Sequence, residues 1–282
     1  LLSTLTGNAQ QYINGNLSTG ATTSNGTTAP AGFTWSEMNA TNTTIGYGNN
    51  ITDFRLADNF TVPAGTWNVT KMTFYAYSTN YAGATSPFND VRVRIYNGAP
   101  NAGGTVIFGD VTTNRFLSST TASIYRIVNA TPGTARQVWA IEANVNVALA
   151  AGTYWVEWGV NNTTPLASNF TPPSTITGQP SPAGSNALQL AVATNTWTAA
   201  TDGAGPQDIY FKIDYTTGAC TGTPAPGNTI SSAASVCPTI PFTLSLQNAT
   251  SGSGITYQWQ SGPSSTGPWT NIAGATNSTY TT

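Results

Sequence analysis

Residues 55–78 read RLADNFTVPAGTWNVTKMTFYAYS, and this stretch decides the fold class. It begins with a short apolar approach, continues through a Pro-Ala-Gly segment that predicts a turn, and ends in a long strand. Side chains of that strand alternate between two faces, namely Met72, Phe74 and Ala76 against Lys71, Thr73, Tyr75 and Tyr77. Period-two alternation bounded by Pro and Gly is typical of a half-buried antiparallel strand.

The same alternation recurs as far as residue 215. In residues 90–96 it separates Val91, Val93 and Ile95 from Arg92, Arg94 and Tyr96. Further strands are expected at residues 105–109, 123–128, 137–145, 152–160, 187–192 and 208–215. Many short strands with turn signals between them, and few or no helices, predict an all-β fold. We expect an antiparallel, jelly-roll-like β-sandwich.

The composition restricts the function. Charged residues make up 6% of the 282 residues, yet there are eight Trp, twelve Tyr and ten Phe, so we expect a folded protein with a neutral polar surface. A net charge of −2 without a basic stripe argues against nucleic-acid binding, and no segment has the apolar length of a membrane span. The chain contains no His, which excludes Ser-His-Asp and Cys-His catalysis, and its two Cys are too few for a structural zinc site.

Changes in composition predict the domain organisation. Residues 1–217 are expected to form the sandwich, with an extended lead-in at residues 1–50 that holds one or two short strands. Residues 218–228, rich in Thr, Gly and Pro, are expected to be a linker. Residues 229–282 are expected to form an incomplete immunoglobulin-like sandwich, with Cys237 on an early strand and Trp259 on the next.

These residues resemble a known group of proteins. Cys237 and residues 257–260, 262–269 and 271–276 resemble the immunoglobulin-like repeats of large secreted proteins from Bacteroidetes, which the type 9 secretion system exports. The first domain resembles a β-sandwich at the N-terminal end of such proteins, through residues 56–60, 67, 73–77, 106–110, 151–155 and 176–178. The resemblance implies a secreted protein at the cell surface, an adhesin or a modular exoenzyme. It also implies contact with an outer-membrane secretion or anchoring apparatus.

The pairing of the two cysteines has two interpretations. The repeats that the chain resembles carry further cysteines downstream, so Cys237 is expected to pair with a partner beyond Thr282. Alternatively, Cys237 pairs with Cys220 across the linker. An oxidising, extracellular compartment is consistent with either pairing.

Exposed aromatic rings are the first candidate binding site. Rings on the presumed outer face or on loops, next to a carboxylate, would suit a carbohydrate; the candidates are Tyr75, Tyr77, Tyr81, Trp155 and Glu157. The competing interpretation, which is favoured, is that these rings pack in the core of a two-sheet sandwich. A glycosidase would need a second carboxylate, for which Glu142 is the candidate. We favour the view that Glu157 is a surface carboxylate on an aromatic-rich strand.

Carboxylates at strand ends are candidate calcium ligands, and they are Asp53, Asp58 and Asp90. Turn formation by Asp and Asn is the alternative, and it is favoured. The expected function is therefore a non-enzymatic extracellular adhesin or filament-forming segment without a cofactor, apart from a candidate structural calcium ion. Its expected partners are glycans, other proteins or further copies of the chain. The alternative is an accessory carbohydrate-binding module of a larger secreted hydrolase.

Overall fold

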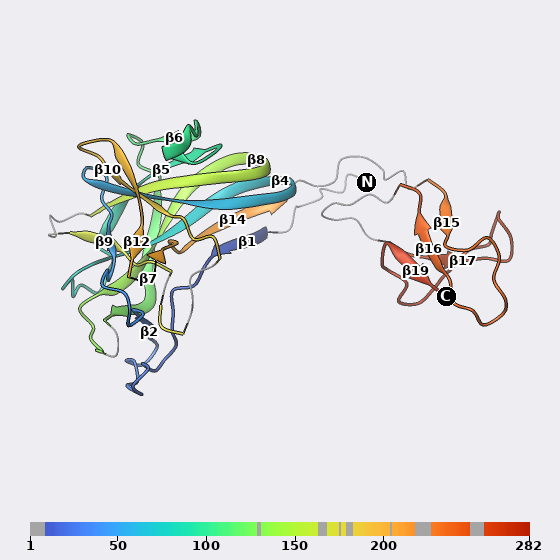
Figure 1. Cartoon of the computed structure of the whole chain (residues 1–282), viewed down its shortest axis with the longest axis horizontal. Helices are drawn as coiled ribbons and strands as arrows, with labels where there is room; N and C mark the ends of the chain where they lie inside the picture. The colour runs from blue at the N-terminus through green and yellow to red at the C-terminus, as the bar shows by residue number, and fades with distance from the viewer. Residues whose placement is uncertain are drawn as a thin grey trace. The chain divides into compact units, whose positions relative to one another are not determined.

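The computed structural model describes residues 9–128, 131–162, 168–174, 176–178, 183–203, 205–217, 227–248 and 257–282. The chain divides after Thr217 into two compact units, which are described separately (Figure 1). Most of the expected linker, and Cys220 with it, lies outside the described residues. The described secondary structure consists of β-strands and one short 3-10 helix, η1 (Pro100–Ala102), so the all-β prediction is confirmed.

Two long paired strands form the frame of the first unit. β4 (Phe54–Ser78) runs antiparallel to β8 (Gln137–Asn162) along most of its length. The turn predicted around Pro63 is wrong, because the segment is a bend inside β4. Pro63 has no N–H to donate, and Gly65 adopts a φ of 97°, so the pairing stops after Val62 and resumes with a shifted register. The two strands expected within residues 137–160 are likewise one continuous strand, since β8 stays paired with β4 on both sides of this bend.

The two halves of this pair belong to two facing layers. In one layer the strand order is β11, β10, β4, β8, β5, β6, and in the other it is β1, β14, β4, β8, β7, β2. The flanking strands are β1 (Ala9–Asn14), β2 (Thr34–Glu37), β5 (Phe88–Tyr96), β6 (Val106–Asp110), β7 (Phe116–Ile127), β10 (Leu188–Ala191), β11 (Thr196–Ala199) and β14 (Phe211–Thr217). All these neighbours are antiparallel except β2 and β7, which are parallel. A long antiparallel strand pair folded into two facing layers is typical of a jelly-roll-like β-sandwich, as predicted.

Short strands complete the unit. β3 (Tyr47–Gly48) pairs with β9 (Asn169–Thr171), which also pairs with the end of β4. β12 (Thr201–Asp202) pairs with β13 (Gly205–Pro206).

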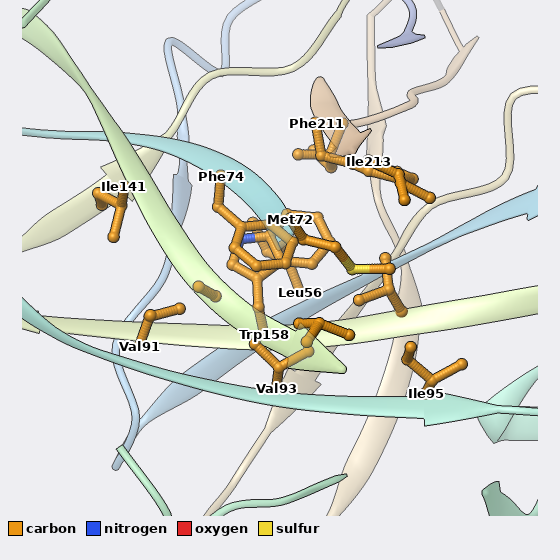
Figure 2. Close-up of a cluster of buried hydrophobic side chains, with 14 of the residues drawn as sticks. Leu56, Met72, Phe74, Val91, Val93, Ile95, Ile141, Trp158, Phe211 and Ile213 are labelled. Atoms are coloured by element: carbon orange, nitrogen blue, oxygen red, sulfur yellow. The ribbon is translucent and has the colours of Figure 1, made fainter. Parts of the chain in front are cut away.

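The space between the layers is filled by the side chains that the alternation predicted to face inward. Met72, Phe74 and Ala76 are fully buried, and the Phe74 ring stacks on Trp158 with a centroid separation of 4.8 Å. Figure 2 shows this ring pair among residues of β4, β5, β8 and β14. Because Phe74 and Trp158 come from opposite halves of the β4–β8 pair, their contact joins the two layers directly.

The opposite face of β4 departs from the prediction. Tyr75 is 7% exposed and Tyr77 is fully buried, so their expected position on an open outer face is wrong. They pack with Leu17, Val138 and Phe170 in a second cluster outside the main core. Covering segments, which a strand pattern does not reveal, therefore bury the outer face of β4 around Tyr75 and Tyr77.

The lead-in is an integral part of the sandwich. β1 pairs with β14 along its full length, and its Tyr12 ring lies about 6 Å from the rings of Phe60, Trp67 and Phe211. Trp35 of β2 is also buried. The lead-in is therefore packed into the first unit, and its strand β1 covers one side of the main core.

The second unit contains two small antiparallel sheets. One consists of β15 (Thr229–Ser231), β16 (Thr243–Leu246) and β19 (Thr279–Thr281); the other consists of β17 (Gln260–Ser261) and β18 (Thr270–Asn271). The expected strand position of Cys237 is wrong. Cys237 is exposed in the loop between β15 and β16, where prolines interrupt the ladder and its carbonyl oxygen accepts a bond from Ile240 N at 3.2 Å.

Among the described residues, no helix has the length and apolar character needed to cross a membrane.

Candidate functional site

A cluster of charged side chains surrounds the buried Glu157 in the first unit. This carboxylate is 1% exposed and lies opposite Arg94 of β5 and Ala57 of β4 in the sheet. Arg55 Nε donates to Glu157 Oε1 at 2.5 Å, and Arg94 Nη2 lies 2.7 Å from Oε2. Tyr96 Oη also donates to Oε2. Two guanidinium groups and one phenol thus surround a single carboxylate.

The electrostatics of this cluster follow from its burial. Burial lowers the pKa of Arg94, but its hydrogen bond and charge interaction with Glu157 outweigh that effect, so the pKa is raised. Burial and the Glu157 charge raise the pKa of Tyr96, which keeps the phenol protonated as a donor. The expected surface position of Glu157 is wrong, since the residue is buried and its carboxylate is held in place by Arg55, Arg94 and Tyr96.

A glycine makes room for the cluster. A Cβ at Gly159 would lie 3.0 Å from Arg55 Cγ and 3.2 Å from Ile51 Cα. The Arg55 side chain therefore crosses β8 where this strand has no side chain of its own.

The ring expected beside Glu157 is also covered. Trp155 is 7% exposed and packs with Ala57, Tyr96, Leu188 and the half-buried Trp197. Its predicted exposure is wrong because the β10–β11 hairpin contributes apolar side chains to this face. In this structure Trp155 has no open face for stacking on a sugar ring.

Tyr81 is the most accessible of the predicted rings, and it is half-buried. Its ring meets Trp139 edge-on at 6.3 Å, and its hydroxyl donates to Thr85 O at 2.8 Å. The structure does not bring it together with Tyr75, Tyr77 and Trp155 as a single patch, since Tyr81 packs against the main core and the others belong to separate clusters.

The carboxylate pair considered for hydrolysis is also separated. Glu142 lies between the core residues Ile141 and Ala143 in the second layer, so it points outward there, where it pairs with Lys71. Glu157 points outward from the first layer, between Val156 and Trp158. The two groups lie on opposite outer faces of the sandwich.

The three calcium candidates do not converge. Asp53 is exposed and accepts a bond from Asn50 Nδ2 at 3.0 Å, whereas Asp90 forms a two-pronged pair with Arg92 at 2.6 Å. Asp58 is buried and accepts bonds from Ile209 N, Asn59 N and Asn14 Nδ2 at 2.7–3.0 Å. No group of three His, Cys, Asp or Glu side chains suited to a metal occurs in the part of the chain that the structure describes.

An apolar projection stands at one edge of the first layer. Among the described strands β6 pairs only with β5, and its Val106 and Ile107 are 43% and 44% exposed. The register passes from Ile95–Phe108 to Tyr96–Val106, which leaves Ile107 as a bulged residue without a partner on β5. The sequence indicated a strand here, but a bulge cannot be recognised without the strand opposite it.

The second unit has an open apolar groove of about 470 Å³, lined by Val236, Cys237, Pro238, Thr239, Ile240, Pro241, Phe242 and Thr282. Ile240 is 56% exposed. The predicted pairing of Cys237 has not been tested, since Cys220 lies outside the described residues. Within the described part of the chain Cys237 forms no disulfide, and it is exposed at this groove.

Comparison with known proteins bears on the second unit. Residues 226–282 match a family described as a domain of unknown function (DUF8696). No curated protein and no solved structure matches the chain.

Proposed function

We propose that this chain is a non-catalytic segment of a secreted, cell-surface adhesin or filament, and that it associates with other protein chains through the β6 edge. The observation that carries the proposal is the exposed pair Val106 and Ile107 on an outer strand. Exposed aliphatic neighbours on a sheet edge are a typical site of association between proteins.

The bulge at Ile107 favours one mode of association. An interrupted ladder is a poor template for an added strand, so a partner would bury the two side chains instead of extending the sheet. A second copy of this chain is the partner that we propose. Such contacts would depend little on salt, because only 18 of the 282 residues, 8 Lys and Arg with 10 Asp and Glu, are charged.

The state of the carboxylates supports a role without catalysis. Glu157 and Glu142 are held by cations on opposite faces, and so they are poorly arranged to act on one substrate. The alternative role, a carbohydrate-binding module, has less support because three of its four proposed rings are buried.

The test is the self-association of the whole chain, measured by sedimentation velocity over a range of protein concentrations. The double substitution Val106→Lys and Ile107→Lys is expected to weaken association at least tenfold, roughly the effect of losing one apolar anchor. Leu117→Lys is the matched control, because Leu117 of β7 is 50% exposed but lies away from the free edge. Equal association of wild type and the double variant would overturn the proposed contact.

A further inference from the structure

Arg126 of β7 is a buried cation that forms no ion pair with any carboxylate among the described residues. It is fully buried beneath the segment before β3, and the residues described here provide no carboxylate within ion-pair distance. Its Nε donates to Ile45 O at 2.8 Å and its Nη1 donates to Ser36 Oγ at 3.1 Å. Its Nη2 has no hydrogen-bond partner within the described part of the chain. An uncompensated buried guanidinium is strongly unfavourable, so some group should meet Nη2.

A second unpartnered donor approaches the same stretch of backbone. The fully buried Tyr77 hydroxyl has no partner among the described groups. A Cβ at Gly46 would lie only 2.6 Å from Tyr77 Oη, so this oxygen lies against Gly46, the neighbour of the Ile45 that accepts from Arg126. Burial raises the pKa of Tyr77 to about 12, and Arg126 partly offsets this effect; the phenol is therefore a donor at neutral pH.

Residues 43–47, which cover these groups, are hydrogen-bonded to residues 201–202 on either side of Ile45. Asp202 accepts bonds from Thr43 N at 2.9 Å and Thr44 N at 2.6 Å, and Tyr47 Oη donates to Thr201 O at 3.0 Å. These bonds hold residues 43–47 closed over Arg126 and leave no exposed approach to its guanidinium. Any group held there is small and enters as the protein folds.

We propose that a small monovalent anion, chloride in ordinary buffers, is bound between Arg126 Nη2 and Tyr77 Oη. Both flanking groups are donors, which suits an anion and excludes a cation. Asp202 interacts with Arg126 electrostatically, but no described carboxylate lies within ion-pair distance of it. The anion would supply this direct counter-charge, and it would satisfy both orphaned donors together. This ion is structural: it stabilises the covering segment without taking part in contacts between proteins.

The experiment is thermal unfolding of the whole chain at constant ionic strength, with sodium gluconate replaced stepwise by sodium chloride. An anion that binds only the folded state should raise the unfolding midpoint by several degrees, on the order of 2–4 °C for each 1 kcal/mol of binding. General salt effects are small because the chain carries so few charges. Identical midpoints in chloride and gluconate would overturn the proposal, since an uncharged water would then be filling the site.

Two variants separate the site from general stability. Tyr77→Phe removes one donor and keeps the ring, so it should reduce the chloride-dependent shift. Tyr75→Phe is the matched control, because Tyr75 is a buried phenol on the same strand whose hydroxyl interacts with Tyr210; its chloride dependence should equal that of wild type. In crystals grown in bromide, an anomalous peak between Arg126 and Tyr77 would support the proposal, and a site without such a peak would overturn it.

Discussion

Arg94 and Glu157 lie directly opposite each other on β5 and β8, and the guanidinium of Arg94 contacts both carboxylate oxygens. The pair lies on the outer face of the first layer. There the Glu157 carboxylate also accepts hydrogen bonds from Arg55 and Tyr96. Because the register places Arg94 and Glu157 opposite each other, each charge is already engaged by the other.

Removing the Glu157 charge should destabilise the fold more than any exposed ion pair does. Glu157→Gln keeps the volume but leaves two guanidinium groups without a counter-charge, at a cost of about 3 kcal/mol in the free energy of unfolding. Urea denaturation measures this loss. The control is Asp90→Asn, which breaks the more accessible pair with Arg92 and should cost at most about 1 kcal/mol. Similar losses in both variants would contradict the argument.

The space at Gly159 should be required for the Arg55 crossing. Gly159→Ala should lower the free energy of unfolding by about 1–3 kcal/mol, because the new methyl group meets Arg55 and also the rigid backbone at Ile51. Gly133→Ala is the control: a Cβ there meets nothing within 4 Å. Calorimetry should show a lower unfolding midpoint for Gly159→Ala and an unchanged one for Gly133→Ala. An unchanged midpoint for Gly159→Ala would refute the steric clash with Arg55 and Ile51.

Asp58 should make the protein less stable as the pH rises. Burial, followed by the charge of Asp208, raises the pKa of Asp58 well above its ordinary 3.8. An acid with a raised pKa in the folded state favours folding below its unfolded pKa, and this contribution is lost as the pH rises through the folded pKa.

The check is the denaturation midpoint measured upward from about pH 4. Asp58→Asn should make the denaturation midpoint fall less steeply as the pH rises. A smaller fall should remain in this variant, because the pKa of Asp208 is also raised. Asp53→Asn makes the same change in net charge at an exposed position and serves as the control. A wild-type profile that rises with pH throughout this range would show that Asp58 does not control it.

The edge strand β6 should depend on Gly109. Gly109 adopts a φ of 80°, and a Cβ there would lie 2.1 Å from Val93 O, so Gly109→Ala should detach β6 from β5. Hydrogen exchange at the β6 amides should accelerate while exchange in the β4–β8 ladder stays slow. Gly103→Ala has a similar φ of 87° but open space around the Cβ, so it controls for backbone strain alone. Unchanged β6 exchange in Gly109→Ala would exclude this steric account.

The inward faces could be predicted from the sequence, because alternation is a local property. Met72 and Phe74 on β4, and Val91 and Val93 on β5, are buried as their spacing indicates. The outward faces could not, because their burial depends on segments far away in the chain. Tyr77 is covered with the help of Leu17 and Phe170, which no local pattern connects to it.

The charged sites were hidden for the same reason. Glu157, placed between Trp155 and Trp158, reads as an isolated carboxylate until the register brings Arg55 and Arg94 beside it. The bend at Pro63 was misread as a turn because Pro and Gly mark both features. Only the continued pairing of β4 with β8 distinguishes the two.

The pairing of β1 with β14 has a mechanical consequence. Ala9 lies opposite Thr216, so the chain enters and leaves the first unit at the same end of one antiparallel ladder. Tension applied through these two points would open the ladder bond by bond from that end, instead of shearing all its bonds at once. Under such tension the first unit would lengthen at low force, with β1 separating from β14 while the long β4–β8 pair stays intact.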